Sequence, residues 1–226
     1  MRVSAAIMAH PARIEMVGDL RTRLDRDVPV VWDEVGDRHD TGLRSLQAYD
    51  PTADYHVVVQ DDVLPAPDLL AGIERALAHI PDGCPASFYV GKVKPFRGLV
   101  ERAVTDADGA SWIVMDGIYW GPCIAVPTDT IDRIARWWWG QGRIHNNYDK
   151  RLSKWFERHG RRCWYSWPSL VDHRGDVSLV RGHTAQRNAH RFVDSSALAV
   201  DWTGEVVELR QTARLDRRRQ QLAGRR

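Results

Sequence analysis

Residues 55–63 constrain the fold most, because they join an uninterrupted apolar run to two adjacent acids. The run YHVVVQDDV is rich in β-branched residues and does not alternate, which predicts a strand buried on both faces of a parallel sheet. Asp61 and Asp62 follow at its carboxyl end, where open α/β sheets bind their ligands. Two adjacent carboxylates repel each other unless a cation or hydrogen-bond donors offset their charge. Alternatively, one of them caps a helix or a turn, because Pro65 and Pro67 follow closely.

The first 80 residues are predicted to alternate between strands and helices. Apolar runs predict strands at residues 2–8, 28–32 and 55–60. Helical spacing of apolar residues predicts helices at 11–24 and 68–80, a short helix at 42–49, and a polar loop at 33–40. Shorter strands are expected at 86–90, 99–105, 111–115, 123–126 and 163–167, and helices at 128–139 and 148–159. The chain is therefore predicted to be an α/β protein with a Rossmann-type, mostly parallel sheet flanked by helices and a smaller mixed region.

One domain is expected over residues 1–190, followed by a basic extension at 191–226. Residues 210–226 contain seven arginines and one acid, which suggests attraction to a polyanion such as nucleic acid or an anionic membrane surface. A solvated helix or a frayed tail is the alternative.

Cysteine content and hydropathy indicate the cellular compartment in which the protein is expected. Three scattered cysteines argue against a disulfide framework and a cysteine-based zinc site, and they favour a reducing cytoplasm. No apolar run approaches the roughly 20 residues that span a bilayer, and the amino terminus is predicted to be a first strand and not a signal peptide.

Four segments occur in an order that is more specific than any one of them. They are Gln60-Asp61-Asp62, the turn YWGPC at 119–123, the helix start NNYDKRL at 146–152 and the segment PSLVDH at 168–173. Together they span roughly residues 3–179, and they resemble the GT-A fold nucleotide-sugar glycosyltransferases, most closely small bacterial and phage-encoded members. That family usually has an acid at the first position of the triplet, where this chain has Gln60.

The resemblance implies a metal-dependent enzyme that moves a sugar from a nucleoside-diphosphate sugar to a hydroxyl of a saccharide, a protein or a modified DNA base. It implies that Asp62 and His173 hold Mn²⁺ or Mg²⁺, which stabilises the departing diphosphate. Asp149 would be the general base, in an arrangement compatible with inversion. A helix N-terminus favours the ionised carboxylate, so a charged but weak base is expected. Alternatively, Asp149 only caps its helix, and His173 is a loop histidine that hydrogen-bonds to Asp172.

Donor-binding residues are predicted from the same topology. The candidates are His10 and Arg13 for the base or diphosphate, Asp33 for the base or ribose, Asp61 for the ribose, Arg44 for the diphosphate and Gly121 for close approach to the sugar. Arg174 and Ser178 are candidates for a phosphate clamp. For each residue taken alone, a surface or capping role is an alternative.

Two other functions compete with glycosyl transfer. A nucleic-acid-binding protein would use the Arg-rich tail, but it would leave the acidic strand end unexplained, because acids repel phosphate. A metal-dependent nucleotidyltransferase also needs acids at a sheet edge. A phosphate loop of the form GxxxxGK[ST] and the nucleophile motif GxSxG are both absent from the sequence, which argues against P-loop NTPases and α/β-hydrolases.

Overall fold

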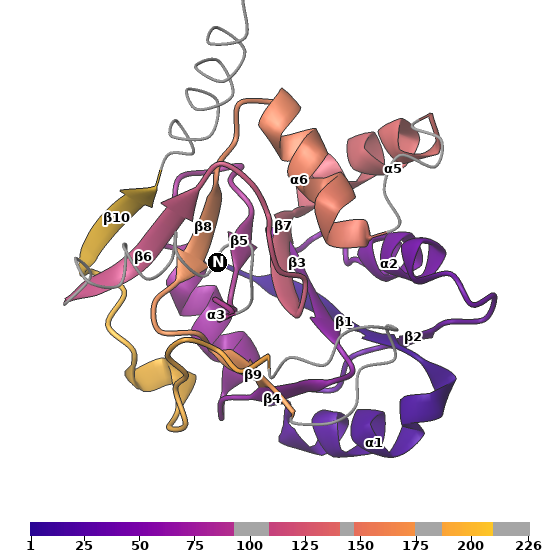
Figure 1. Cartoon of the computed structure of the whole chain (residues 1–226), viewed down its shortest axis with the longest axis horizontal. Coiled ribbons are helices and arrows are strands. Elements are labelled where there is room, and N and C mark those ends of the chain that lie inside the picture. The colour runs from indigo at the N-terminus through magenta and orange to yellow at the C-terminus, as the bar shows by residue number, and fades with distance from the viewer. Residues whose placement is uncertain (93–108, 141–146, 175–186, 210–226) are drawn as a thin grey trace, which may run out of the picture.

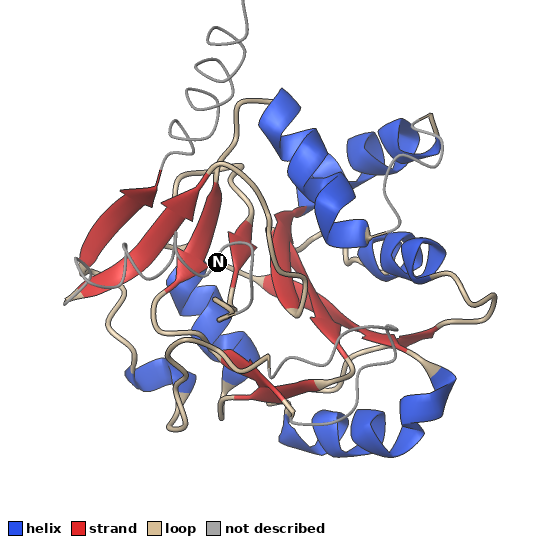
Figure 2. Cartoon of the chain, in the orientation of Figure 1, coloured by secondary structure: helices blue, strands red, loops and turns tan. Residues whose placement is uncertain are grey.

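The computed structural model describes residues 1–92, 109–140, 147–174 and 187–209. Over these residues the chain forms an eight-stranded sheet with helices on both faces, and a separate two-stranded sheet (Figures 1 and 2). The large sheet contains, in spatial order, β10 (Glu205–Leu209), β6 (Ala110–Met115), β8 (Cys163–Ser166), β5 (Ala86–Ser87), β7 (Cys123–Pro127), β3 (Tyr55–Gln60), β1 (Val3–Ala9) and β2 (Val30–Trp32). The predicted α/β class is confirmed.

Strand directions bring several loops to one edge of this sheet. β1 is parallel to β2 and β3, while β7 is antiparallel to both β3 and β5. β5 is parallel to β8, β8 is antiparallel to β6, and β6 is parallel to β10. The carboxyl ends of β1, β3, β5 and β8 therefore share one edge with the amino end of β7. The predicted Rossmann-type alternation holds for the β1, β2 and β3 half.

Two apolar cores explain why β3 lacks alternation. Val57 and Val59 face a core that includes α1 (Ile14–Arg23) and α3 (Leu69–Leu77). Val58 faces the opposite core, which includes α2 (Arg38–Gln47), α5 (Ile131–Trp139) and α6 (Tyr148–Arg158). Figure 1 shows α2, α5 and α6 together above the sheet and α1 below it. A strand that is covered on both faces is apolar at most positions, and the buried His56 of β3 is accommodated by its hydrogen bond with the Ser45 carbonyl.

Two local predictions were wrong. Helix α2 begins at Arg38 inside the predicted loop, because the Asp37 carboxylate accepts a hydrogen bond from the His39 N–H at 2.8 Å and caps the helix. Pro65 was expected to break the extended chain after the two acids. Instead, residues Val63–Pro65 form a short strand, β4, that pairs with β9 (Val171–His173). Proline is tolerated in such an edge strand. The strand expected at residues 99–105 lies outside the described residues.

Residues 187–209 pack onto the rest of the fold, so the predicted boundary at residue 190 falls within a packed segment. Here η3 (Ala197–Ala199) lies against α3, β10 extends the sheet, and Trp202 is buried with its ring centroid 5.1 Å from that of Trp112. The Arg-rich residues 210–226 are not among the described residues.

The three cysteines are buried and free. Within the described ranges, no helix combines the length and the apolar character needed to cross a membrane.

Candidate active site

The ends of β1 and β3 bring the first-turn residues to the acidic pair. The two strands are in register, with Met8 opposite Gln60, so the residues that follow them are neighbours. The His10 N–H donates to Asp61 Oδ2 at 2.7 Å. Arg13, at the end of η1 (Pro11–Arg13), places Nη1 2.7 Å from Asp61 Oδ1 and 2.9 Å from Asp62 Oδ2. One guanidinium nitrogen therefore bridges both carboxylates.

The two-stranded sheet brings in His173. Val63 in β4 lies opposite His173 in β9, and the Arg174 N–H donates to the Asp62 carbonyl at 3.0 Å. As a result, His173 Nδ1 lies 3.6 Å from Asp62 Oδ2. The hydrogen bond between Asp172 and His173 runs from the backbone N–H of His173 to the Asp172 carboxylate at 2.8 Å, and it does not use the imidazole ring. The sequence-predicted pair Asp62 and His173 is thus adjacent in space.

This acid cluster (Arg13, Asp61, Asp62 and His173) is largely buried. The side chains of Arg13, Asp61 and Asp62 are 11%, 7% and 12% exposed. Burial raises the pKa of Asp61, although the His10 N–H and Arg13 oppose the change. Burial also lowers the pKa of His173, with Asp62 opposing, which favours the neutral imidazole that binds metals.

One oxygen of the cluster lacks a partner. Asp62 Oδ1 is buried, and no protein group of the described residues hydrogen-bonds to it. A buried polar atom without a partner costs about 1–3 kcal/mol, and more when it is charged. Such an atom in a native protein needs an explanation, and a bound ion is one of the usual ones.

Asp149 reaches the same sheet edge through the turn before β7. Gly121 lies so close that a Cβ there would be 3.1 Å from Gln60 Nε2 and 3.4 Å from Asp149 Cβ. Tyr148, whose hydroxyl donates to the Gly121 carbonyl, fixes the start of α6 against this turn. A side chain at Gly121 would therefore make tight contacts within the protein, and the predicted contact of Gly121 with a sugar stays a prediction.

The pKa of Asp149 corrects the expectation from its position on the helix. Burial raises it to about 6, while the Lys150 N–H, which donates to Oδ1 at 2.8 Å, lowers it. Desolvation outweighs the helix terminus, so the pKa of Asp149 lies above that of an ordinary carboxylate at a helix start. A carboxylate with a pKa of about 6 is well matched to proton abstraction near neutral pH.

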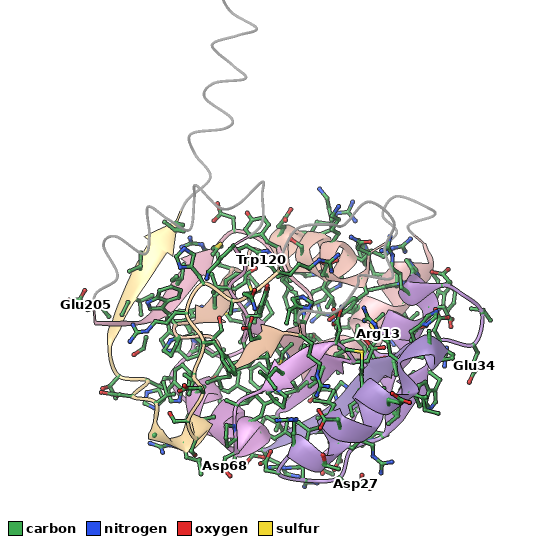
Figure 3. All side chains as sticks on the ribbon, turned by 60° about the horizontal axis from the view of Figure 1, so that its bottom comes forward. Arg13, Asp27, Glu34, Asp68, Trp120 and Glu205 are labelled. Carbon is green, nitrogen blue, oxygen red and sulfur yellow. The ribbon has the colours of Figure 1, made fainter. Side chains whose placement is uncertain are left out.

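Aromatic rings continue from the acid cluster toward the turn at residues 119–123. The Tyr89 ring lies edge-on to His173, with centroids 5.3 Å apart, and edge-on to Trp120, at 6.3 Å. Trp120 is partly exposed and also contacts Tyr165. In Figure 3, Arg13 and Trp120 lie within the body of the molecule, whereas Asp27, Glu34 and Glu205 lie at its rim. Tyr89 and Tyr148 were not predicted as site residues, because Tyr89 lies in a predicted strand and Tyr148 at the start of a predicted helix.

Three further candidates are tied to other groups. Asp33 accepts hydrogen bonds from backbone N–H groups in the loop after β2, including that of Asp37 at 3.1 Å. Arg44 pairs with Asp40 at 2.7 Å and donates to the Trp32 carbonyl at 2.8 Å. Arg174 forms an ion pair with Asp19 on α1. The contacts of Asp33 and Arg44 do not join them to the acid cluster, whereas Arg174 lies beside it, with Nε 3.3 Å from the Val63 carbonyl. Ser178 lies outside the described residues.

Asp62 and His173 are the candidate metal ligands of the acid cluster. In the part of the chain that the structure covers, three or more His, Cys, Asp or Glu side chains do not come together as a metal site. Asp62 and His173 thus form a two-residue donor set. Two surface cavities lie elsewhere, one of about 460 Å³ beside residues 18–27 and one of about 540 Å³ lined by residues that include Tyr49, Asp54 and Asp129.

Of the known proteins compared with this chain, only solved structures are similar to it. No protein-family model matches the sequence, and no curated protein sequence matches it either. Among solved structures, the chain is similar to a crystal structure of a glycosyltransferase involved in the glycosylation of the major capsid of PBCV-1. The two are 12% identical with a TM-score of 0.35, over 75% of this chain and 93% of that chain. A likeness of this size identifies neither a fold nor a function.

Proposed function

We propose that this protein is a glycosyltransferase that moves a sugar from a nucleoside-diphosphate sugar to an acceptor hydroxyl, with Mn²⁺ or Mg²⁺ as cofactor. The observation that carries the proposal is the environment of the Asp62 carboxylate. Its buried Oδ1 has no hydrogen-bond partner among the described residues, and its other oxygen lies beside a histidine whose neutral form burial favours. A carboxylate and an imidazole at the carboxyl edge of an α/β sheet suit a divalent cation that is shared with substrate phosphates.

Asp62 and His173 would hold the ion, and donor phosphates and water would complete its coordination. Two protein ligands are enough for such an ion, because Mg²⁺ commonly binds through one or two carboxylates together with substrate phosphates. When bound, the ion neutralises charge that develops on the departing diphosphate. Asp61 has both oxygens engaged, by His10 and Arg13, so we assign it to positioning the first turn.

Asp149 would accept the proton of the acceptor hydroxyl. As that oxygen bonds to the anomeric carbon, the bond between this carbon and the diphosphate oxygen breaks, and the nucleoside diphosphate leaves with the electron pair. A base that activates the acceptor directly supports a single displacement with inversion. The raised pKa of about 6 supports this assignment, since the carboxylate is both ionised and basic at neutral pH.

Thermal unfolding with nucleotides tests the proposal. Mn²⁺ together with UDP or GDP should stabilise the protein, by about 2.7 kcal/mol when the ligand is at 100 times its Kd. Asp62→Asn should abolish the Mn²⁺-dependent part, and the control Asp27→Asn, at an exposed position, should retain it. Asp149→Asn should keep donor binding and lose transfer, measured with a panel of nucleotide sugars and with saccharide, protein and modified-DNA acceptors.

Stabilisation that survives Asp62→Asn unchanged would refute the metal site. Stabilisation by DNA alone, without any response to nucleotides, would favour the nucleic-acid-binding function instead.

A further inference from the structure

We propose that Arg13 is a built-in cation that offsets part of the negative charge of the acid cluster before the donor arrives, so that the divalent ion binds together with the diphosphate and not ahead of it. The inference rests on the metal site of the proposed function and concerns the order in which its ligands bind.

The geometry places Arg13 in competition with a metal ion. Its Nη1 lies 2.9 Å from Asp62 Oδ2, the oxygen that is also nearest to His173. An Mg²⁺ ion on Asp62 would bind at about 2.0–2.1 Å from a carboxylate oxygen. The ion and the guanidinium would then share one carboxylate in a largely buried setting, where like charges repel strongly.

The charge of the cluster points the same way. Two carboxylates and one guanidinium leave a net charge of about minus one, with His173 neutral. Gln60, at the first position of the triplet, adds an amide and no charge. One arginine therefore offsets half of the carboxylate charge without an ion, and it would offset only a third of that charge if a third acid stood at position 60.

The local structure allows Arg13 to leave the acids without disorganising them. The His10 N–H holds Asp61 Oδ2 at 2.7 Å independently of the Arg13 side chain. His10 itself is fixed, because its Nδ1 accepts a hydrogen bond from the Ala12 N–H at 3.1 Å at the start of η1. Arg13 can thus turn its long side chain toward a diphosphate while the backbone of the turn stays in place.

A diphosphate resolves the competition between the two cations. It adds negative charge and acceptor oxygens, which match a guanidinium as well as a carboxylate does. Arg13 can then pair with the diphosphate, and the ion can occupy Asp62 and His173. Binding of the ion and of the nucleotide is therefore expected to be mutually favourable, by the same factor in both directions.

Mn²⁺ binding, followed through the electron paramagnetic resonance signal of free Mn²⁺, tests the inference with and without UDP. In the wild-type protein, UDP should tighten Mn²⁺ binding at least tenfold. Arg13→Gln should bind Mn²⁺ without nucleotide at least tenfold more tightly than wild type, and UDP should then add less. Arg13→Lys, which keeps the charge, and Arg21→Gln, at an exposed ion pair on α1, should bind Mn²⁺ without nucleotide as weakly as wild type.

If Arg13→Gln does not fold, the wild-type measurement without UDP still keeps the inference open to refutation. Tight Mn²⁺ binding to the wild type without UDP, unchanged by UDP, would overturn the role of Arg13 and leave the transferase proposal intact. Absence of Mn²⁺ binding in every protein, with UDP present, would overturn the metal site itself and this inference with it. Neither result depends on whether a sugar is transferred.

Discussion

Asp149→Asn is expected to stabilise the protein at neutral pH while it removes activity. The substitution keeps the shape of the side chain and its acceptor for the Lys150 N–H, but it removes a carboxylate that burial disfavours. The pKa rises from 3.8 to about 6, and each pKa unit corresponds to about 1.4 kcal/mol, which gives roughly 3 kcal/mol. Asp149 is only partly buried, so solvent screening reduces this to roughly 1–2 kcal/mol.

The sign of this effect depends on pH. Between about pH 4 and pH 6 the folded wild-type protein holds the Asp149 proton more strongly than the unfolded chain does. Its free energy of unfolding therefore falls as the pH rises through this window. The Asn variant lacks this loss, so its advantage should be absent below pH 4 and complete above pH 6.

Activity should respond in the opposite direction. An amide cannot accept the proton of the acceptor hydroxyl, so kcat should fall by about 10²–10⁴. In the wild-type protein, kcat/KM should be lost as the pH falls through about 6, because the base becomes protonated.

Urea unfolding at pH 4, 5, 6 and 8 measures the stability difference, and transfer assays at the same pH values measure the rate. Asp129→Asn, at an exposed position at the opposite edge of the sheet, serves as the control and should change neither quantity. A variant that is less stable than wild type at pH 8, or a difference that does not vary with pH, would refute the assignment of a buried, raised-pKa base.

Two further predictions concern packing and acid sensitivity. Gly72→Ala should destabilise the protein by about 1–3 kcal/mol in urea unfolding, because the new Cβ would lie 2.3 Å from that of Ala197. Gly18→Ala, in α1, should instead stabilise the protein by about 0.5–1 kcal/mol, because a Cβ there would have no other atom within 4 Å. His56 is buried, with its ring 2.8 Å from the Ser45 carbonyl, and burial lowers its pKa from 6.5 to about 4. Stability should thus be lost as the pH falls from 6.5 to 4, by up to roughly 3 kcal/mol, and pH-dependent melting of His56→Asn should show a flatter profile.

The sequence by itself determined the elements that local patterns encode. The apolar run at residues 55–60 predicted a strand buried on both faces, with the acids that follow it at the ligand-binding edge of the sheet, and β3 has that burial. A helix was predicted at residues 148–159, and α6 spans Tyr148–Arg158, with Gly160 after it at a positive φ of 65°. These features follow from residues that are neighbours along the chain.

The tertiary structure decided how the candidate site is assembled. Only the pairing of β4 with β9 sets His173 beside Asp62, and only the close approach of Gly121 to Gln60 brings Asp149 to the same edge. The bridge from Arg13 to both carboxylates and the raised pKa of Asp149 depend on burial and on partners distant in the sequence. Desolvation and pairing between separate segments are properties of the packed chain, which is why sequence patterns placed the acids but did not reveal their charge balance.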